Sequence, residues 1–161
     1  MNVETLFLNT AVARLRQFTD QIAVCLGKLN DEQIWARAHD NENAVGNLVL
    51  HLAGNVRQWI VSGLGGKPDI RVRDREFSAR GGITGEELAA RLRETVEDAA
   101  GVISGLAAEQ LVQVREIQNR QASGVEAVFN VVAHFGQHSG QIIFATKNLT
   151  GQDLGLVMPR R

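Results

Sequence analysis

Cysteine, proline and tyrosine are scarce or missing in this sequence of 161 residues, which has one cysteine, two prolines and no tyrosine. The single cysteine, Cys25, excludes an intramolecular disulfide. Because there is no tyrosine, no phenol is available to donate or accept a proton. Acid–base chemistry therefore falls to histidine, a carboxylate or a metal-bound water.

An excess of one charge and long apolar runs are also missing. The formal net charge is -1, so no strong field attracts nucleic acid or anionic lipid. No apolar stretch approaches the roughly 20 residues that cross a bilayer, and the segment from Met1 to Glu4 lacks the pattern of a secretory signal. We expect a cytoplasmic protein with no nucleic-acid partner and no membrane association.

The composition is that of an ordinary globular protein, with 44% hydrophobic and 22% charged residues. A chain of this length fits one hydrophobic core, because single domains typically contain about 100 to 150 residues. We therefore predict a single domain over residues 1–161.

Helical periodicity is visible in four stretches, where apolar residues recur at steps of three and four. Two of these stretches open with a capping box, in which a hydroxyl and a glutamate satisfy the first amides of a helix. The pattern predicts an all-α four-helix bundle. The predicted helices cover residues 3–29, 44–62, 84–106 and 123–148.

Two connecting segments have a character of their own. Residues 69–82 are dense in charge, and they form either a solvated connection or a loop that flanks a functional site. Residues 111–117 alternate apolar and polar side chains, which indicates an extended segment. We do not expect a sheet there.

Three of the four histidines have positions that suit a metal site. His134 and His138 are four residues apart, so on a helix their Cβ atoms lie about 6 Å apart on one face. That face continues through Val131 and Ile142 and so points into the bundle. His51 lies in the middle of the second predicted helix, among apolar neighbours. Three imidazoles leave open positions on a divalent ion, and the alternative is that all three are ordinary core histidines.

Other residues near the histidines limit the chemistry. Phe135 follows His134, so the helix lacks the glutamate of the His-Glu-x-x-His metalloproteases. No glutamate stands three residues before a histidine, which excludes the di-iron carboxylate signature. Asn55, Gln137 and Gln141 are candidates for amides that orient a ligand ring or bind substrate.

The segments LVLHLAGN at 48–55 and AHFGQHSGQI at 133–142 resemble the two histidine blocks of the DinB-like superfamily, also called DinB/YfiT-like metalloenzymes. The resemblance spans nearly the whole chain and is strongest to an uncharacterised bacterial branch. It implies an up-down-down-up bundle, a zinc or nickel ion held by His51, His134 and His138, and a homodimer.

The resemblance also implies what such a site does. Some relatives are metal-dependent transferases that use a low-molecular-weight thiol as cosubstrate, and others are described as hydrolases. We expect a metal-dependent enzyme of one of these types acting on a small molecule, with Arg57, Arg73 and Arg75 as candidates for holding an anionic substrate. The alternatives are a non-catalytic metal or small-ligand binding protein of the stress response, and a structural dimer.

Overall fold

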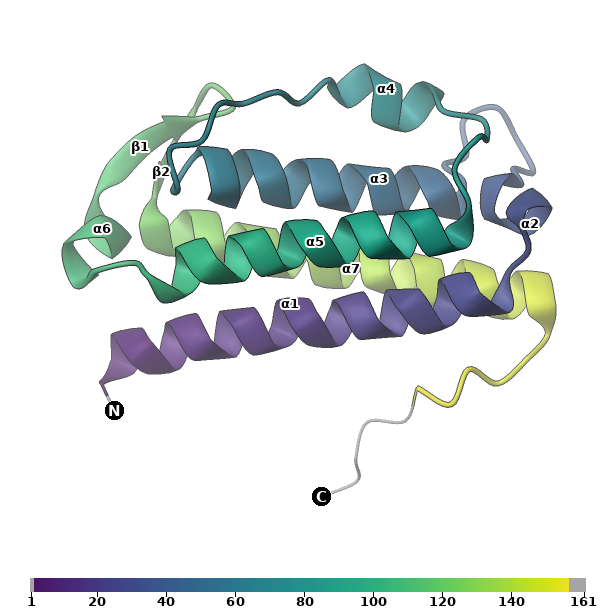
Figure 1. Cartoon of the computed structure of the whole chain (residues 1–161), viewed down its shortest axis with the longest axis horizontal. Coiled ribbons are helices and arrows are strands. Elements are labelled where there is room, and N and C mark those ends of the chain that lie inside the picture. Colours follow the sequence, from purple (N-terminus) through teal and green to yellow (C-terminus); the bar gives the residue numbers. More distant parts are fainter. Residues whose placement is uncertain (1, 157–161) are drawn as a thin grey trace.

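Four long helices form most of the computed structural model, which describes residues 2–156 (Figure 1). The all-α fold class is therefore confirmed, while the predicted domain limits of 1–161 extend beyond the described residues. The second long helix ends in a π-helical segment, η1. The long elements are α1 (Val3–Lys28), α3 (Val45–Val56) with η1 (Arg57–Ser62), α5 (Gly85–Ser104) and α7 (Gly124–Thr150).

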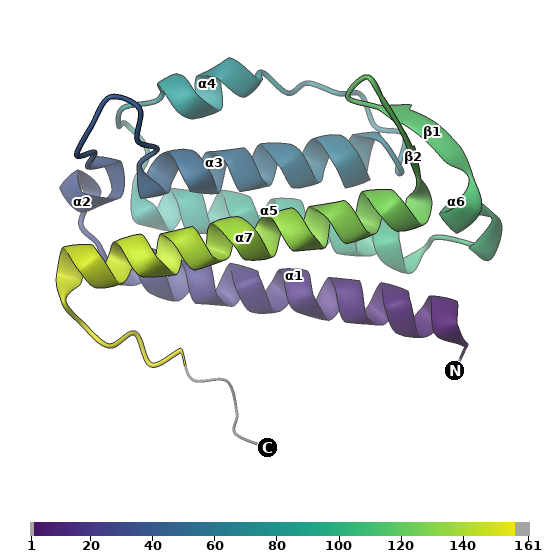
Figure 2. The same ribbon diagram turned by 180° about the vertical axis from the view of Figure 1, so that it is seen from behind.

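Short elements occupy the connections between the long helices. One of them, α4, lies in the charge-dense segment, and the others lie at the ends of the bundle (Figures 1 and 2). They are α2 (Asp31–Trp35), α4 (Arg73–Ser78), α6 (Ala108–Val112), β1 (Val114–Ile117) and β2 (Arg120–Ser123).

The long helices pack in a four-sided arrangement, in which α1 and α3 each contact both α5 and α7. In Figures 1 and 2, α1 and α7 run in one direction, and α3 and α5 run in the other. The chain can keep this direction from α3 to α5 because the connection that contains α4 travels back along α3. This connection thereby covers one side of α3.

The core consists mostly of aliphatic side chains, with the aromatic rings of Phe135 and Trp59 among them. Phe135 on α7 is 0% exposed and lies near Phe18 of α1, with 6.1 Å between ring centroids. Cys25 is buried among the apolar residues of α1, as its position on an apolar stripe indicates. The apolar stripes that predict the helices thus do face one common interior.

The hairpin of β1 and β2 corrects the expectation that no sheet forms. Residues 114–117 are extended, as their alternation indicates, but they also pair antiparallel with residues 120–123. A turn of two residues joins the strands, with φ values of 54° at Gln118 and 59° at Asn119. Such turns usually contain glycine, and this one does not, so the turn gave no signal in the sequence.

Both capping boxes are confirmed. The Thr84 hydroxyl accepts a hydrogen bond from the Glu87 amide, and the Ser123 hydroxyl accepts one from the Glu126 amide. Each glutamate carboxylate in turn accepts a bond from the amide of its capping residue. None of the helices in the described part of the chain combines the length and hydropathy that a bilayer crossing requires.

We predict that Ser123→Ala lowers the free energy of unfolding by about 1 kcal/mol, because it leaves an amide at the start of α7 without its acceptor. Urea denaturation measures this change. Ser104→Ala is the matched control, since Ser104 is exposed in the last turn of α5, and it should change the value by less than about 0.5 kcal/mol. Equal effects of the two substitutions would contradict the capping role.

Candidate metal centre

Three imidazole rings meet between α3 and α7. Nε2 of His134 lies 3.1 Å from Nε2 of His51 and 3.1 Å from Nε2 of His138. The nitrogens that the three rings offer all lie within 4.8 Å of one another. Nitrogens that bind zinc tetrahedrally at about 2.0 to 2.1 Å are about 3.3 Å apart. The three rings therefore have a spacing that one ion can bridge.

Hydrogen bonds at the far side of two rings fix where their protons lie. His51 Nδ1 is 2.9 Å from Oε2 of Glu76, and His138 Nδ1 is 2.6 Å from Oε1 of Gln141. Both oxygens are acceptors, so they favour the tautomer with the ring proton on Nδ1 and a lone pair on Nε2. Arg71 Nη2 also lies 3.1 Å from His51 Nδ1, but it donates to Glu76 Oε2 at the shorter distance of 2.8 Å. Two lone pairs thus point toward His134.

His134 cannot satisfy both lone pairs by itself. A neutral imidazole has one ring proton and can donate it to only one partner. Nδ1 of His134 is buried and has no hydrogen-bond partner among the described residues. A divalent cation would accept all three Nε2 lone pairs at once, so this donor set fits a metal ion.

Burial favours the neutral form of His134 and His138, which is the form that binds metal. Burial, together with the nearby His138, His51, Arg71 and Arg73, lowers the pKa of His134 to about 4. Burial also lowers the pKa of His138. The hydrogen bond to Gln141 acts in the opposite direction, but the net pKa still lies below the usual value. At neutral pH protons therefore compete weakly for these two rings.

A buried ion pair holds His51 in place. The Glu76 carboxylate, which is 7% exposed, accepts bonds from Arg71 Nε at 2.6 Å and Arg71 Nη2 at 2.8 Å, as well as from His51. Burial raises the pKa of Glu76, but the bonds from Arg71 and His51 outweigh it, so the net pKa lies below the usual value. Glu76 is thus a carboxylate that orients the His51 ring, as carboxylates commonly do for histidines that bind metals.

The backbone of α4 is fixed so that Glu76 reaches His51. Nδ2 of the fully buried Asn47 donates to the carbonyl of Glu76 at 2.7 Å and to that of Ala79 at 3.0 Å. Nη2 of Arg37 donates to Asn47 Oδ1 at 2.6 Å and to the carbonyl of Phe77 at 3.2 Å. The start of α3 and the segment after α2 therefore hold α4 against the bundle.

Glycine is required at position 54 for the same reason. A Cβ atom on Gly54 would overlap Oε1 of Glu76 and lie 2.9 Å from Nε of Arg71. Gly140, on α7, has nothing within 4 Å of the place where its Cβ would lie. Close approach of the Arg71–Glu76 pair therefore explains the glycine at position 54, and no such approach explains Gly140.

The charge-dense segment contains the residues that sequence reasoning missed. Arg71 and Glu76 both lie in residues 69–82, and the side chain of Arg71 is only 4% exposed. Residues 69–82 were predicted to be either a solvated connection or a loop that flanks a functional site. The buried contact of Arg71 and Glu76 with His51 agrees with the second interpretation. The only sequence feature that points to the buried Arg71–Glu76 pair is Gly54, a glycine inside an apolar helix and one turn from His51.

The three candidate amides have different surroundings. Gln141 bonds to His138, as described above. Asn55 lines a cavity beside His51 and His134 and forms no hydrogen bond with either ring among the described residues. Gln137 is exposed and likewise forms none with the three histidines.

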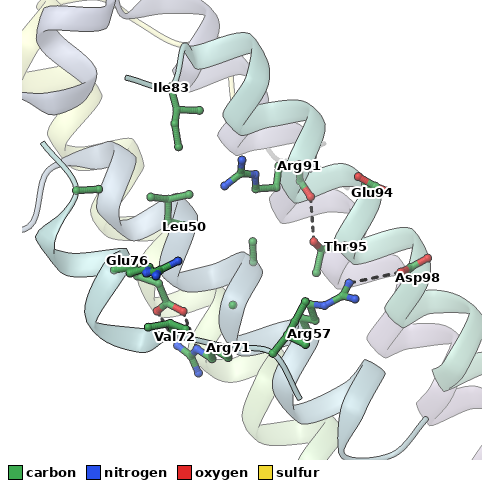
Figure 3. Close-up of a pocket in the computed structure, with 15 residues that line it drawn as sticks. Leu50, Arg57, Arg71, Val72, Glu76, Ile83, Arg91, Glu94, Thr95 and Asp98 are labelled. Atoms are coloured by element: carbon green, nitrogen blue, oxygen red, sulfur yellow. Dashed lines mark hydrogen bonds and ion pairs between the residues drawn. The ribbon is translucent and has the colours of Figure 1, made fainter. Parts of the chain in front are cut away.

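One cavity is lined by His51 and His134, and another by Arg71 and Glu76. The smaller, about 320 Å³, reaches the rings of His51 and His134. The larger, about 480 Å³, lies between α3, α4 and α5, and Arg71 and Glu76 form one of its walls (Figure 3). Of these two cavities, the smaller gives a molecule access to the imidazoles.

The three candidate arginines divide between the two cavities. Arg73 lines the smaller cavity beside the histidines. Arg57 and Arg75 line the larger one, where Arg57 lies 3.9 Å from Asp98 of α5 (Figure 3). Of the three, Arg73 alone lines the cavity that reaches His51 and His134.

Comparison with known proteins agrees with this fold. A family model described as "Protein of unknown function (DUF1572)" matches residues 2–160. No curated protein matches the chain.

Three solved structures of low sequence identity have the same fold. A conserved protein of Enterococcus faecalis has a TM-score of 0.73 and 15% identity, covering 94% of this chain and 99% of its own. A DinB-like protein of Bacillus cereus has a TM-score of 0.70 and 16% identity, with coverage of 94% and 95%. A DinB-like protein of Bacillus subtilis has a TM-score of 0.67 and 13% identity, with coverage of 89% and 93%.

We predict that the metal-free protein loses stability as the pH falls from 6.5 toward 4. In this range the unfolded chain binds a proton at residue 134 that the folded chain does not, because the pKa of His134 drops from 6.5 to about 4 on folding. The free energy of unfolding therefore decreases as the pH falls through this range. Urea denaturation at several pH values measures the slope.

His134→Gln should flatten that slope, and His39→Gln should leave it unchanged, because His39 is exposed in the loop after α2. An equally steep slope in His134→Gln and the unsubstituted protein would contradict the assignment.

Proposed function

The chain belongs to the DUF1572 family of proteins of unknown function and has a DinB-like fold, and from its three histidines we propose that it is a metal-dependent enzyme acting on a small molecule. The supporting observation is the convergence of three Nε2 lone pairs on one point, with two of the rings held by Glu76 and Gln141. His51, His134 and His138 would be the ligands of a zinc or nickel ion.

The cavity next to the rings favours thiol transfer over hydrolysis. When bound, a divalent ion would supply a Lewis acid that lowers the pKa of a thiol or of water. Hydrolysis commonly also uses a separate general base, and none of the described residues that line the cavity is acidic. A thiol has a pKa of about 8.5 before it binds, whereas that of bulk water is about 15.7. A thiol therefore needs the smaller shift to reach its attacking form without a base.

In the proposed reaction, the thiolate sulfur forms a bond to an electrophilic atom of the second substrate, and the leaving group departs with its electron pair. The protein's own residues do three things. Glu76 and Gln141 keep the Nδ1 protons of two ligand rings in place, and the buried Arg71 keeps Glu76 ionised. The cavity orients the reacting molecule. A homodimer, which the family resemblance implies, remains a prediction.

We predict that protein purified without an affinity tag contains about one divalent ion per chain, and that His138→Ala retains less than about a tenth of that amount, because two imidazoles hold an ion poorly. Elemental analysis measures the content. His39→Ala removes an exposed imidazole elsewhere and should leave it unchanged.

If the protein contains no stoichiometric metal and His138→Ala changes only its stability slightly, the three rings are ordinary core histidines and the proposal is wrong.

We further predict that turnover requires both the metal and a small thiol. The zinc and nickel forms are incubated with chlorodinitrobenzene, with and without glutathione, bacillithiol or mycothiol, and separately with nitrophenyl acetate. Product formation only with thiol, lost in His138→Ala, supports thiol transfer. Ester cleavage without thiol supports a hydrolase, and tight metal retention with no turnover on either substrate supports the non-catalytic alternative.

A further inference from the structure

The cavity at the metal centre has a one-sided charge. Two guanidinium groups line it, those of Arg73 and Arg120, together with the amides of Asn55, Gln118 and Asn130. No described residue of its lining carries a negative charge. A divalent ion at the histidines would add further positive charge, so the cavity is suited to an anion.

Arg73 lies over the ring of Phe77, which is tilted by 42° against the ring of His51. Its guanidinium carbon lies 4.8 Å from the centroid of the Phe77 ring, and Phe77 lies 4.9 Å from the centroid of the His51 ring. This contact fixes the guanidinium without neutralising it. Its hydrogen-bond donors therefore remain available to a ligand.

Arg120 enters the cavity from the hairpin, which a side-chain hydrogen bond fastens to the bundle. Trp59 of η1 donates from Nε1 to Oε1 of Gln118 at 3.0 Å. Gln118 is in the turn, with φ of 54°, and the turn places Arg120 opposite Ile117 at the start of β2. A left-handed conformation at a non-glycine residue costs about 1 kcal/mol or more, and the bond from Trp59 offsets it.

Some arginines of the bundle are neutralised by ion pairs, whereas Arg73 and Arg120, both exposed at the cavity, are not. Arg71 pairs with Glu76 at 2.6 Å, and Arg16 pairs with Glu97 at 2.6 Å. Arg73 and Arg120 form no ion pair within the described residues 2–156. Two unpaired guanidinium groups that share a cavity are a common arrangement for recognising oxyanions.

We propose that this cavity binds the oxyanion of a substrate between Arg73 and Arg120, while another atom of the same molecule faces the three histidines. The substrate class is a small molecule with a metal-binding donor at one end and a carboxylate or similar oxyanion at the other. This inference rests on the proposed function, because it takes the histidines to hold a metal.

The cobalt form of the full chain tests the proposal by binding rather than by turnover. The probes are mercaptopropionate, mercaptoethanesulfonate, mercaptopropanol and cysteamine, which share a thiol and differ in the charge at the other end. The cobalt–thiolate absorption band reports binding of each probe. The variants are Arg73→Gln and Arg120→Gln, and Arg75→Gln is the matched control, because Arg75 lies on the same short helix but lines the other cavity.

The two anionic probes should bind about tenfold or more tightly than mercaptopropanol, because charge-assisted hydrogen bonds add to the thiolate contact. Cysteamine should bind most weakly. Arg73→Gln and Arg120→Gln should each remove most of the preference, and Arg75→Gln should keep it. Comparison of the carboxylate with the sulfonate identifies which oxyanion the two arginines prefer.

The outcomes separate this inference from the proposed function. If the protein retains cobalt but binds anionic and neutral probes with equal affinity, the inference about the oxyanion is wrong and the proposed function still stands. A preference that survives both substitutions also overturns it, because chelation of the ion by the probe's own oxyanion would then explain the preference. Failure to bind cobalt overturns the proposed function and the inference with it.

Discussion

The buried contact between Glu76, Arg71 and His51 is the constraint on which the rest of the site depends. Taking a carboxylate out of water is costly unless it is paired and hydrogen-bonded, and Arg71 and His51 together supply those bonds. The contact lies in a connection between helices, so the chain must bring that connection back along α3. Asn47 and Arg37 hold the connection there.

Much of the fold and the three histidines could be predicted from the sequence. The spacing of His134 and His138 places both rings on one face of any helix, and the apolar neighbours of His51 turn it inward. These conclusions need only the geometry of a helix. The starts of α5 at Thr84 and α7 at Ser123 could be predicted for the same reason, because a capping box involves only residues that are three apart in the sequence.

Residues from the connections could not be predicted in this way. Arg71 and Glu76 lie in a charged segment, and nothing local distinguishes a buried charged pair from a solvated one. Their burial depends on Gly54 and Asn47, which are distant in sequence. Arg120 and Gln118 were missed because a turn formed by glutamine and asparagine resembles a loop. Tertiary contacts, including the bond from Trp59, decide these positions.

The solved relatives share this fold at 13 to 16% identity, and fold alone does not fix a function. Gly54 shows how tightly the site nevertheless restricts what can vary. A methyl group there would displace the carboxylate that orients His51, so the two positions cannot change independently. A side chain at position 54 would require the Glu76 carboxylate to move, and with it the contact that orients His51. The geometry of the three histidines therefore depends on an atom that residue 54 lacks.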